Sequence, residues 1–250
     1  MIELRDVHRR YQRVHALRGV SLTVEAGQRF GIVGESGSGK STLVRLLAGL
    51  DRPTSGEISF QGKRIDDLPE RRLGFLRSEL QVVFQDPMGS LDPRMRVRDI
   101  ISEPLGRTDR ARVAEMLAAV GLPADSGDRY PHQFSGGQRQ RISIARALAP
   151  RPSVLVADEP VSALDVSVRK QILDLLADLV ARFDLTLVFV SHDLGVVRRI
   201  CDTVAVMRHG EIVERGEVAT VYSAPRHPYT RELIAAAPNL HAELERLRGR

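Results

Sequence analysis

The sequence of 250 residues contains a single cysteine, Cys201. One cysteine excludes an internal disulfide and any zinc site built from several thiolates. Long hydrophobic runs are also missing: the stretch Leu185–Val190 (LTLVFV) is far shorter than the roughly 18–20 residues of a membrane-spanning helix. The beginning of the chain, MIELRDVHRR, lacks the apolar core of a signal peptide. We therefore expect a soluble protein that is not secreted by that route.

Lysine is scarce: only Lys40, Lys63 and Lys170 stand among the 37 basic residues. The 32 acidic residues leave a formal net charge of +5. A basic balance can indicate an anionic partner such as nucleic acid, a membrane surface or a phosphate ligand. A solvated, arginine-rich surface is the simpler explanation, so the charge alone assigns no function.

Strand and helix patterns alternate in the outer parts of the chain. Arg29–Val33 and Ser153–Ala157 are short apolar runs typical of buried strands, whereas Ser167–Phe183 has the spacing of a helix. This alternation predicts an α/β fold with a mostly parallel sheet. From about Pro87 to Pro150 the pattern is helical throughout, with clear amphipathic helices at Arg110–Val120 and Ser135–Ala149. We interpret this middle part as a helical insertion into the sheet.

A phosphate-binding loop is the most specific motif. Gly34–Ser41 (GESGSGKS) fits the pattern G-x-x-x-x-G-K-[ST] and lies between a predicted strand and a helix. Glycines let backbone N–H groups curl around phosphate oxygens, and the helix offers its positive N-terminus. Lys40 is expected to reach the β- and γ-phosphates, and Ser41 to offer a hydroxyl to Mg²⁺. The predicted phosphate-binding residues are Gly34, Glu35, Ser36, Gly37, Ser38, Gly39, Lys40, Ser41 and Thr42.

Two acidic residues supply what such a loop needs in addition. Asp158 and Glu159 follow the apolar strand Val154–Ala157. A carboxylate at the end of a buried strand can hold Mg²⁺ through its water shell, and we assign this role to Asp158. Glu159 could then accept a proton from the attacking water or orient it. Alone, two acids before a proline are an ordinary strand end, so their value comes from the pairing with the loop.

Ser135–Gln138 (SGGQ), followed by RQRISIAR, resembles the signature motif of ATP-binding-cassette (ABC) ATPases. A serine and two glycines at a helix N-terminus form a second anion cradle, although the same residues also suit a simple N-cap. Further motifs occur in the order of that family. They are Tyr11 for stacking on adenine, Gln85 for the Q-loop, Ser162–Asp165 for the D-loop, and His192 for the switch histidine.

The resemblance covers nearly the whole chain and implies the architecture of a P-loop NTPase of the ABC type. That architecture combines a mostly parallel core sheet, an N-terminal antiparallel β part and an inserted helical subdomain. It places the ATP-binding core at residues 1–86 and 151–222, the helical signature subdomain at 87–150, and a C-terminal tail at 223–250.

The resemblance also implies a mechanism. ATP is the substrate and Mg²⁺ the cofactor, with Ser41 and Gln85 as direct ligands. Glu159, Gln85 and His192 act in catalysis. Two ATP-binding subunits, identical or different, pair head to tail, so that Ser135, Gly136, Gly137 and Gln138 face the partner's ATP and Asp165 lies at the dimer interface. Hydrolysis of an ATP held between two cradles then releases the dimer.

Four stretches resemble the peptide and nickel importer branch: Val83–Ile100 with FQDP and PRM, Phe134, Ala157–Val166 with Val161, and the tail from Arg226 with HPYT through Ala235–Pro238. They imply an importer subunit at the cytoplasmic face of the membrane. Its partners are transmembrane permease subunits and, indirectly, an extracytoplasmic substrate-binding protein. Some subunits of this branch carry a longer tail with a cysteine cluster, which one cysteine cannot form here.

Two alternatives come from other classes of cassette. Cassettes of DNA repair and chromosome organisation insert coiled-coil arms or zinc modules. The spacing from Lys40 to Ser135 leaves no room for an arm and one cysteine cannot form a zinc module, so we expect no nucleic-acid partner. An exporter or a non-transport complex stays open. For an importer we expect Asp86–Glu103, with Met88, Leu91 and Met95, to form the permease docking surface. The same apolar residues could instead pack inside the helical subdomain.

Overall fold

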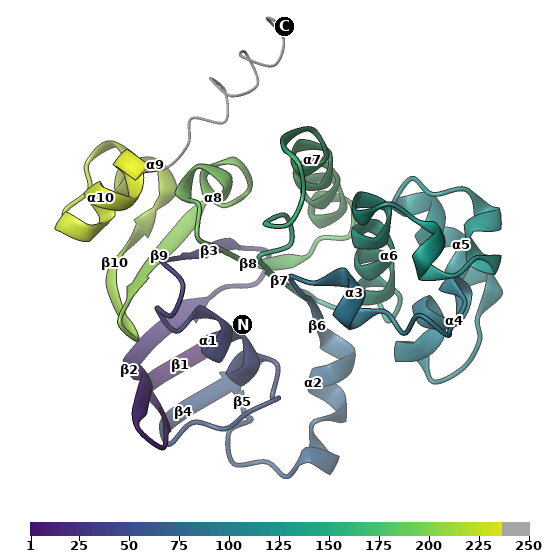
Figure 1. The fold of residues 1–250 in the computed structure, drawn as a ribbon. Coiled ribbons are helices and arrows are strands. Elements are labelled where there is room, and N and C mark those ends of the chain that lie inside the picture. Colours follow the sequence, from purple (N-terminus) through teal and green to yellow (C-terminus); the bar gives the residue numbers. More distant parts are fainter. Residues whose placement is uncertain (237–250) are drawn as a thin grey trace, which may run out of the picture. The chain divides into compact units, whose positions relative to one another are not determined.

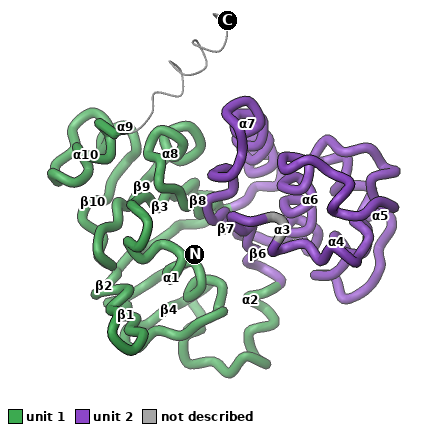
Figure 2. The backbone as a smooth tube through the Cα atoms, in the orientation of Figure 1, with its two compact units in different colours: residues 1–77, 186–250 green, residues 78–185 purple. Residues whose placement is uncertain are grey.

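The computed structural model describes residues 1–236, apart from the side chains of Pro87 and Met88. The chain forms two compact units (Figure 2). Unit 1 comprises Met1–Arg77 and Thr186–Arg250, and unit 2 comprises Ser78–Leu185. The last part of the predicted tail, including Pro238, lies outside the described residues.

An antiparallel sheet begins unit 1 (Figure 1). Its strand order is β2-β1-β4-β5. The strands are β1 (Ile2–Tyr11), β2 (Val14–Val24), β4 (Ser55–Phe60) and β5 (Lys63–Arg64). Ile2, Leu4 and Val7 of β1 are almost completely buried, which fits a sheet with one face toward a core. The N-terminal antiparallel part expected from the sequence is confirmed.

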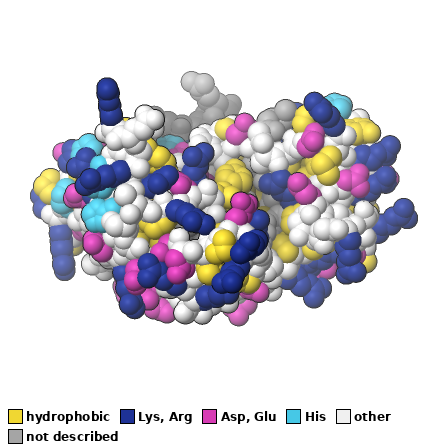
Figure 3. Space-filling view, turned by 90° about the horizontal axis from the view of Figure 1, so that it is seen from below, with side chains coloured by type: hydrophobic (Ala, Val, Ile, Leu, Met, Phe, Trp, Pro, Cys, Tyr) yellow, Lys and Arg dark blue, Asp and Glu magenta, His cyan; other side chains and the backbone are white. Residues whose placement is uncertain are grey.

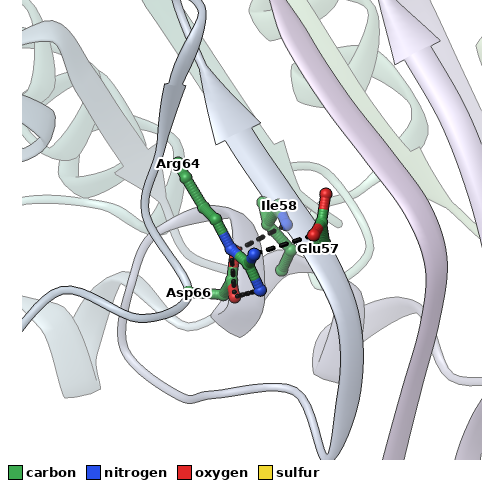
Figure 4. A network of polar contacts seen from close by, with 4 residues as sticks. All are labelled: Glu57, Ile58, Arg64 and Asp66. Atoms are coloured by element: carbon green, nitrogen blue, oxygen red, sulfur yellow. Dashed lines mark hydrogen bonds and ion pairs between the residues drawn. The ribbon is translucent and has the colours of Figure 1, made fainter.

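A polar network closes the β4–β5 edge of this sheet (Figure 4). The Asp66 carboxylate accepts hydrogen bonds from the Arg64 guanidinium and, at 2.8 Å, from the Ile58 backbone N–H. The other side of the guanidinium pairs with Glu57 at 2.7 Å. Burial raises the pKa of Asp66, but the Arg64 and Ile58 hydrogen bonds outweigh burial and hold the pKa below its ordinary value. The carboxylate therefore fastens the chain as it leaves the sheet.

The other strands of unit 1 follow the order β10-β9-β3-β8. They are β3 (Arg29–Val33), β8 (Thr186–Ser191), β9 (Thr203–Arg208) and β10 (Glu211–Glu217), with β10 antiparallel to β9. β3 is parallel to both β8 and β9. All of β8 is buried, as expected for a strand covered on both faces. The helices of this part are α1 (Lys40–Leu47), α8 (Leu194–Ile200), α9 (Val218–Ser223) and α10 (Pro228–Ala236).

Unit 2 combines two parallel strands with a group of helices. The strands are β6 (Leu80–Val83) and β7 (Val154–Asp158). The helices are α3 (Pro87–Ser90), α4 (Val97–Ser102), α5 (Arg110–Ala119), α6 (Gly136–Leu148) and α7 (Val166–Arg182), and α2 (Gly74–Glu79) joins the two units. The buried Arg112 of α5 donates hydrogen bonds to the carbonyls of Leu148 and Ala149, at 2.6 and 2.8 Å. These bonds satisfy the C-terminal carbonyls of α6 and tie α5 to it.

The compact units differ from the domain bounds predicted from the sequence. The prediction put residues 151–222 with the ATP-binding core, whereas β7 and α7 form a unit with the helices. The reason is packing: α6 contacts both β6 and α7 as well as α3, α4 and α5. The individual helices predicted from periodicity are confirmed to within a residue or two at each end. No helix in the described part of the chain is long and apolar enough to cross a membrane.

Candidate functional site

The predicted phosphate loop lies between β3 and α1 in unit 1. Gly34 follows the last residue of β3, and Gly39 is the N-cap of α1 with φ 108°. Gly37 also has a positive φ, of 80°. A Cβ on Gly34 would lie 2.3 Å from the carbonyl oxygen of Met207, so no larger residue fits there. The backbone conformation and the close packing explain why glycine is required at these positions.

Lys40 is buried, with 5% of its surface exposed. Its Nζ donates to the carbonyl oxygens of Gly34 and Glu35, at 2.7 and 2.9 Å. The Ser38 hydroxyl is also buried and has no hydrogen-bond partner among the described residues. Buried polar groups normally have partners. The loop combines a lysine ammonium, a buried hydroxyl and the N-terminus of a helix. These groups can bind the oxygens of a phosphate.

His192 comes to the same edge of unit 1 as the phosphate loop. β3 and β8 are parallel, and Val33 pairs with Ser191. Gly34 and His192 are the residues that follow this pair, so both leave the carboxyl ends of adjacent strands. His192 is exposed, and Asp193 caps α8 by accepting from the Gly195 N–H at 2.8 Å. The strand register thus brings two sequence-predicted parts of the site together.

Tyr11 has contacts that the sequence did not indicate. Its hydroxyl donates to Asp51, and the Arg9 guanidinium lies 4.3 Å above the ring centre. Burial raises the pKa of Asp51, but the hydrogen bonds from Tyr11 and the backbone and the Arg9 charge hold the pKa below its ordinary value. One face of the ring is therefore covered by Arg9. Adenine stacking by Tyr11 stays a prediction.

Gln85, Asp158 and Glu159 leave one edge of the β6–β7 pair in unit 2. Val83 pairs with Ala157 at the carboxyl end of this parallel pair, and the three residues follow that pair in their two segments. Glu159 has φ 46°, in the left-handed region that a glutamate rarely adopts. Its carbonyl oxygen accepts from both the N–H and the hydroxyl of Ser162, at 3.2 and 3.1 Å. Backbone strain of this kind, of order 1–3 kcal/mol, clusters at functional sites.

Ser135–Gln138 forms the beginning of α6. Ser135 is the N-cap, and its hydroxyl accepts from the Gln138 N–H at 3.3 Å. The Gln138 side chain in turn accepts from the Ser135 N–H at 3.0 Å. This capping box confirms the local geometry that the sequence allowed. Ser135, Gly136 and Gln138 are exposed, and the role toward a partner's ATP stays a prediction.

Asp165 has a structural role that the sequence analysis missed. It is the N-cap of α7 and accepts from the Ser167 hydroxyl at 2.6 Å and from the Val168 N–H at 3.0 Å. The Ser167 hydrogen bond, followed by the Val168 N–H, lowers the pKa of the Asp165 carboxyl. An aspartate directly before a helical pattern is the N-cap signal that could have revealed this.

The expected docking surface is wrong in one respect. Leu91 is 2% exposed and belongs to the core of unit 2, so it cannot present an apolar surface to a permease. The alternative, packing inside the helical part, holds for this residue. Met95 is half-buried, and the side chain of Met88 is outside the described part of the chain. The Arg146 guanidinium donates to the Ser90 carbonyl and further fixes the segment on α6.

Two further contacts to the phosphate loop come from the C-terminal third. The Glu35 N–H donates to the hydroxyl of Tyr229 at 2.9 Å, and the Gly210 N–H donates to the Ser38 carbonyl at 2.9 Å. Tyr229 belongs to the HPYT stretch, which in the sequence indicated only a branch of the family. No periodicity or spacing connects positions 194 residues apart.

The donors predicted for Mg²⁺ fit that ion chemically. Ser41 offers a hydroxyl, Gln85 an amide oxygen and Asp158 a carboxylate, and Mg²⁺ prefers oxygen ligands. Ser41 and Gln85 are exposed. Among the described residues no group of three or more His, Cys, Asp or Glu side chains could hold a metal without such help. The donor set therefore suits an ion that binds together with nucleotide phosphates.

Two family models match the sequence. The model "ABC transporter" matches residues 17–162. The model "Oligopeptide/dipeptide transporter, C-terminal region" matches residues 213–250. The first covers the phosphate loop, Gln85, the Ser135–Gln138 segment and Glu159, and the second covers Tyr229.

Similar proteins include two transport proteins. The chain is 48% identical, over 95% of its length and 75% of the relative's, to the dipeptide transport ATP-binding protein DppF of Haemophilus influenzae. It is 53% identical, over 90% of its length, to the glutathione import ATP-binding protein GsiA of Escherichia coli K12, of which it spans 37%.

Solved structures agree on the fold. The ATP-binding cassette MJ0796, in a dimeric post-hydrolysis state bound to ADP and Pi, has a TM-score of 0.79 and 32% identity, covering 87% of this chain and 99% of its own. The structure of cbiO1 from Clostridium perfringens, part of the ABC transporter complex cbiONQ, has a TM-score of 0.81 and 29% identity, covering 98% of each chain.

Proposed function

This chain belongs to the ABC transporter family and is an ATPase of the ABC type, and from this premise we propose that it powers a peptide importer. It binds and hydrolyses ATP and couples the hydrolysis to uptake through separate membrane subunits. The observation that carries the proposal is the match of residues 213–250 to the C-terminal region of oligopeptide and dipeptide transporters. That region distinguishes the chain from ABC cassettes in general.

The relatives favour peptide as the transported substrate. DppF is named for dipeptide transport and GsiA for glutathione import, and glutathione is itself a small peptide. The sequence also left nickel open, and nickel is the alternative substrate of this proposal. The exporter and non-transport alternatives have no support from the C-terminal region.

In unit 1, the loop from Gly34 to Thr42 holds the phosphates of ATP. Backbone N–H groups at the end of the loop and the N-terminus of α1 bind the anion, whereas the Glu35 N–H donates to Tyr229. Lys40 neutralises charge on the β- and γ-phosphates, and Tyr11 stacks on adenine. His192, at the end of the strand beside the loop, contacts the γ-phosphate or the attacking water.

In unit 2, Glu159 orients the attacking water and accepts its proton. Its left-handed backbone, held by Ser162, fixes the direction in which the carboxylate leaves the strand. Gln85 and Asp158 are the oxygen donors for Mg²⁺ that unit 2 would offer, Asp158 through water, and Ser41 is the donor of unit 1. When bound, Mg²⁺ supplies the positive charge that stabilises charge developing on the phosphate oxygens.

The proposed partners follow from incomplete parts of the site. The exposed Ser135–Gln138 segment faces the ATP of a second ATP-binding subunit, identical or different, and Asp165 lies at that interface. Permease subunits carry the substrate across the membrane, and an extracytoplasmic binding protein delivers it to them. The chain then works at the cytoplasmic face of the membrane. The proposal includes no nucleic-acid partner. On the one face that Figure 3 draws, basic and acidic side chains are interspersed, whereas a nucleic-acid site gathers basic side chains.

Uptake by cells tests this proposal. The chain is expressed with its permease subunits and binding protein, and uptake of a labelled dipeptide and of ⁶³Ni²⁺ is compared with that of cells carrying the Glu159→Gln variant. We expect wild-type cells to take up dipeptide and the variant to lose uptake. Nickel uptake without dipeptide uptake would show that the substrate is nickel and not peptide. ATPase activity without uptake of either would contradict the importer role and leave only ATP hydrolysis.

A further inference from the structure

The first residues of α10 connect the C-terminal region to the phosphate loop. We propose that Tyr229 is a positioning residue for nucleotide binding, because its hydroxyl fixes the peptide plane that holds Lys40. This inference rests on the proposed function, since it assigns a task within the same ATP site. It gives the C-terminal region, matched by the family model from residue 213 onward, an indirect part in ATP binding.

The argument begins with one peptide unit. The N–H of Glu35 and the carbonyl of Gly34 belong to the same peptide plane. The N–H donates to the Tyr229 hydroxyl at 2.9 Å, and the carbonyl accepts from Lys40 Nζ at 2.7 Å. No cis peptide bond occurs in the described residues, and in a trans peptide the N–H and C=O point in opposite directions. Tyr229 and Lys40 therefore hold the same plane from its two sides.

This arrangement gives Tyr229 an effect on Lys40 without contact between them. A hydrogen bond to the N–H polarises the peptide and strengthens the carbonyl as an acceptor. It also opposes rotation of the plane, which would turn the carbonyl away from Nζ. Gly34 is closely packed, since a Cβ there would lie 2.3 Å from the Met207 carbonyl oxygen. Lys40 Nζ also donates to the Glu35 carbonyl at 2.9 Å, so one of the two carbonyl bonds that position the ammonium depends on the orientation that the Tyr229 hydroxyl stabilises.

Tyr229 itself is held rigidly. Its side chain is among the largest fully buried ones, with 1% exposure. The Arg208 guanidinium, at the end of β9, lies 4.7 Å from the ring centre. Burial raises the pKa of the Tyr229 hydroxyl above its ordinary value. The hydroxyl therefore stays neutral at physiological pH, and the ring cannot turn away from the loop without opening the core.

The beginning of α10 is anchored on β10 by a carboxylate. Glu214 accepts from the backbone N–H groups of Arg226 and His227, at 2.9 and 3.0 Å. Burial raises the pKa of Glu214, but these hydrogen bonds outweigh burial and the pKa lies below its ordinary value. The same β9–β10 hairpin touches the loop directly through Gly210 N–H and the Ser38 carbonyl. Both contacts place the loop against a fixed C-terminal support.

The test uses substitutions that keep the ring. Tyr229→Phe removes only the hydroxyl. Tyr222→Phe is the matched control, because the Tyr222 ring of α9 lies 4.3 Å from the Arg198 guanidinium and, within residues 1–236, the Tyr222 hydroxyl is not hydrogen-bonded to the loop. Equilibrium binding of Mg-ADP is measured with each purified chain. One neutral hydrogen bond corresponds to about threefold to tenfold in affinity. We expect that loss for Tyr229→Phe, and less than twofold for Tyr222→Phe.

A double-mutant cycle separates positioning from packing. If the hydroxyl acts through Lys40, the loss caused by Tyr229→Phe shrinks to less than twofold when Lys40 is already replaced by Met. A purely structural contribution would persist in the Lys40→Met background. Thermal unfolding without nucleotide checks that each variant is folded.

Each outcome decides the proposal. Wild-type affinity in a folded Tyr229→Phe chain, or an equal loss in the Lys40→Met background, overturns the positioning role. A wild-type chain that binds no Mg-ADP contradicts the proposed function instead. If Tyr229→Phe does not fold, Glu214→Gln decides, since it weakens the anchor of α10 and keeps the tyrosine: weaker Mg-ADP binding by the folded chain supports the proposal, and unchanged binding overturns it.

Discussion

The chain has two glycine-containing segments at helix N-termini, and they differ in what their own unit provides. The phosphate loop has a buried lysine, glycines with positive φ, and hydrogen bonds from the C-terminal third. The Ser135–Gln138 segment is exposed, and its Ser and Gln side chains bond to each other in a capping box. Similar local sequence chemistry therefore produces a loop that is tied to other parts of unit 1, and an exposed helix end in unit 2.

The largest expected effect is on the rate of ATP hydrolysis, and it comes from a substitution outside both segments. Glu159→Gln keeps the size of the side chain and removes its charge and its capacity to accept a proton. Hydrolysis should fall roughly 10²–10⁴-fold, while ATP binding and pairing of subunits persist. Phosphate release and size-exclusion chromatography with Mg-ATP measure the two properties. Near-wild-type hydrolysis would show that the catalytic carboxylate is elsewhere.

Lys40→Ala tests the phosphate loop, the first of the two segments. A hydrogen bond to a charged group contributes about 1.5–3 kcal/mol, so affinity for Mg-ATP should fall roughly tenfold to hundredfold and turnover should be lost. Titration with a fluorescent ATP analogue measures the affinity. Lys63→Ala is the control, because Lys63 is an exposed residue of β5; equal losses in the two variants would contradict a specific role.

Gly136→Asp tests the second segment, Ser135–Gln138. A Cβ at Gly136 would lie 3.7 Å from Leu164, in ordinary contact, so the aspartate fits. Its carboxylate would repel a partner's γ-phosphate, and ATP-dependent dimerisation should weaken about tenfold or more while affinity of the single subunit is retained. Analytical ultracentrifugation with ATP measures the dimer.

The neighbouring position provides an informative contrast. A Cβ at Gly137 would lie 2.5 Å from Val168, so Gly137→Asp should also lower the melting temperature. Loss of ATP affinity by a well-folded Gly136→Asp monomer would place the segment in the subunit's own site.

The smallest expected effect concerns the anchor of α10 and its pH dependence. The folded-state pKa of Glu214 is below its ordinary value, so its carboxylate stabilises the fold above about pH 4.3, the usual pKa of a free glutamate, and this stabilisation is lost as pH falls through the folded-state pKa. Denaturant unfolding of wild type and Glu214→Gln should differ at pH 7 and converge toward pH 3. A difference independent of pH would mean that the charge of Glu214 does not contribute.

The sequence determined the parts whose signals are local. The phosphate loop, Ser135–Gln138, the acidic pair after β7 and the ranges of α5, α6 and α7 follow from spacing and periodicity over a few turns or one strand. Family resemblance extended this to the antiparallel part and the parallel strands, and the fold agrees. Local signals sufficed because glycine conformation, helix capping and strand burial depend on neighbours in the chain.

Only the tertiary structure decided which distant residues meet. Leu91 looked available for docking but is buried, because the helices around α6 enclose it. The units group β7 and α7 with those helices, since packing rather than chain order defines a compact body. The hydroxyl of Tyr229 reaches a peptide 194 residues away. A single hydrogen bond across that separation leaves no periodic trace in the sequence, so it becomes visible only when strand pairing has brought the two segments together.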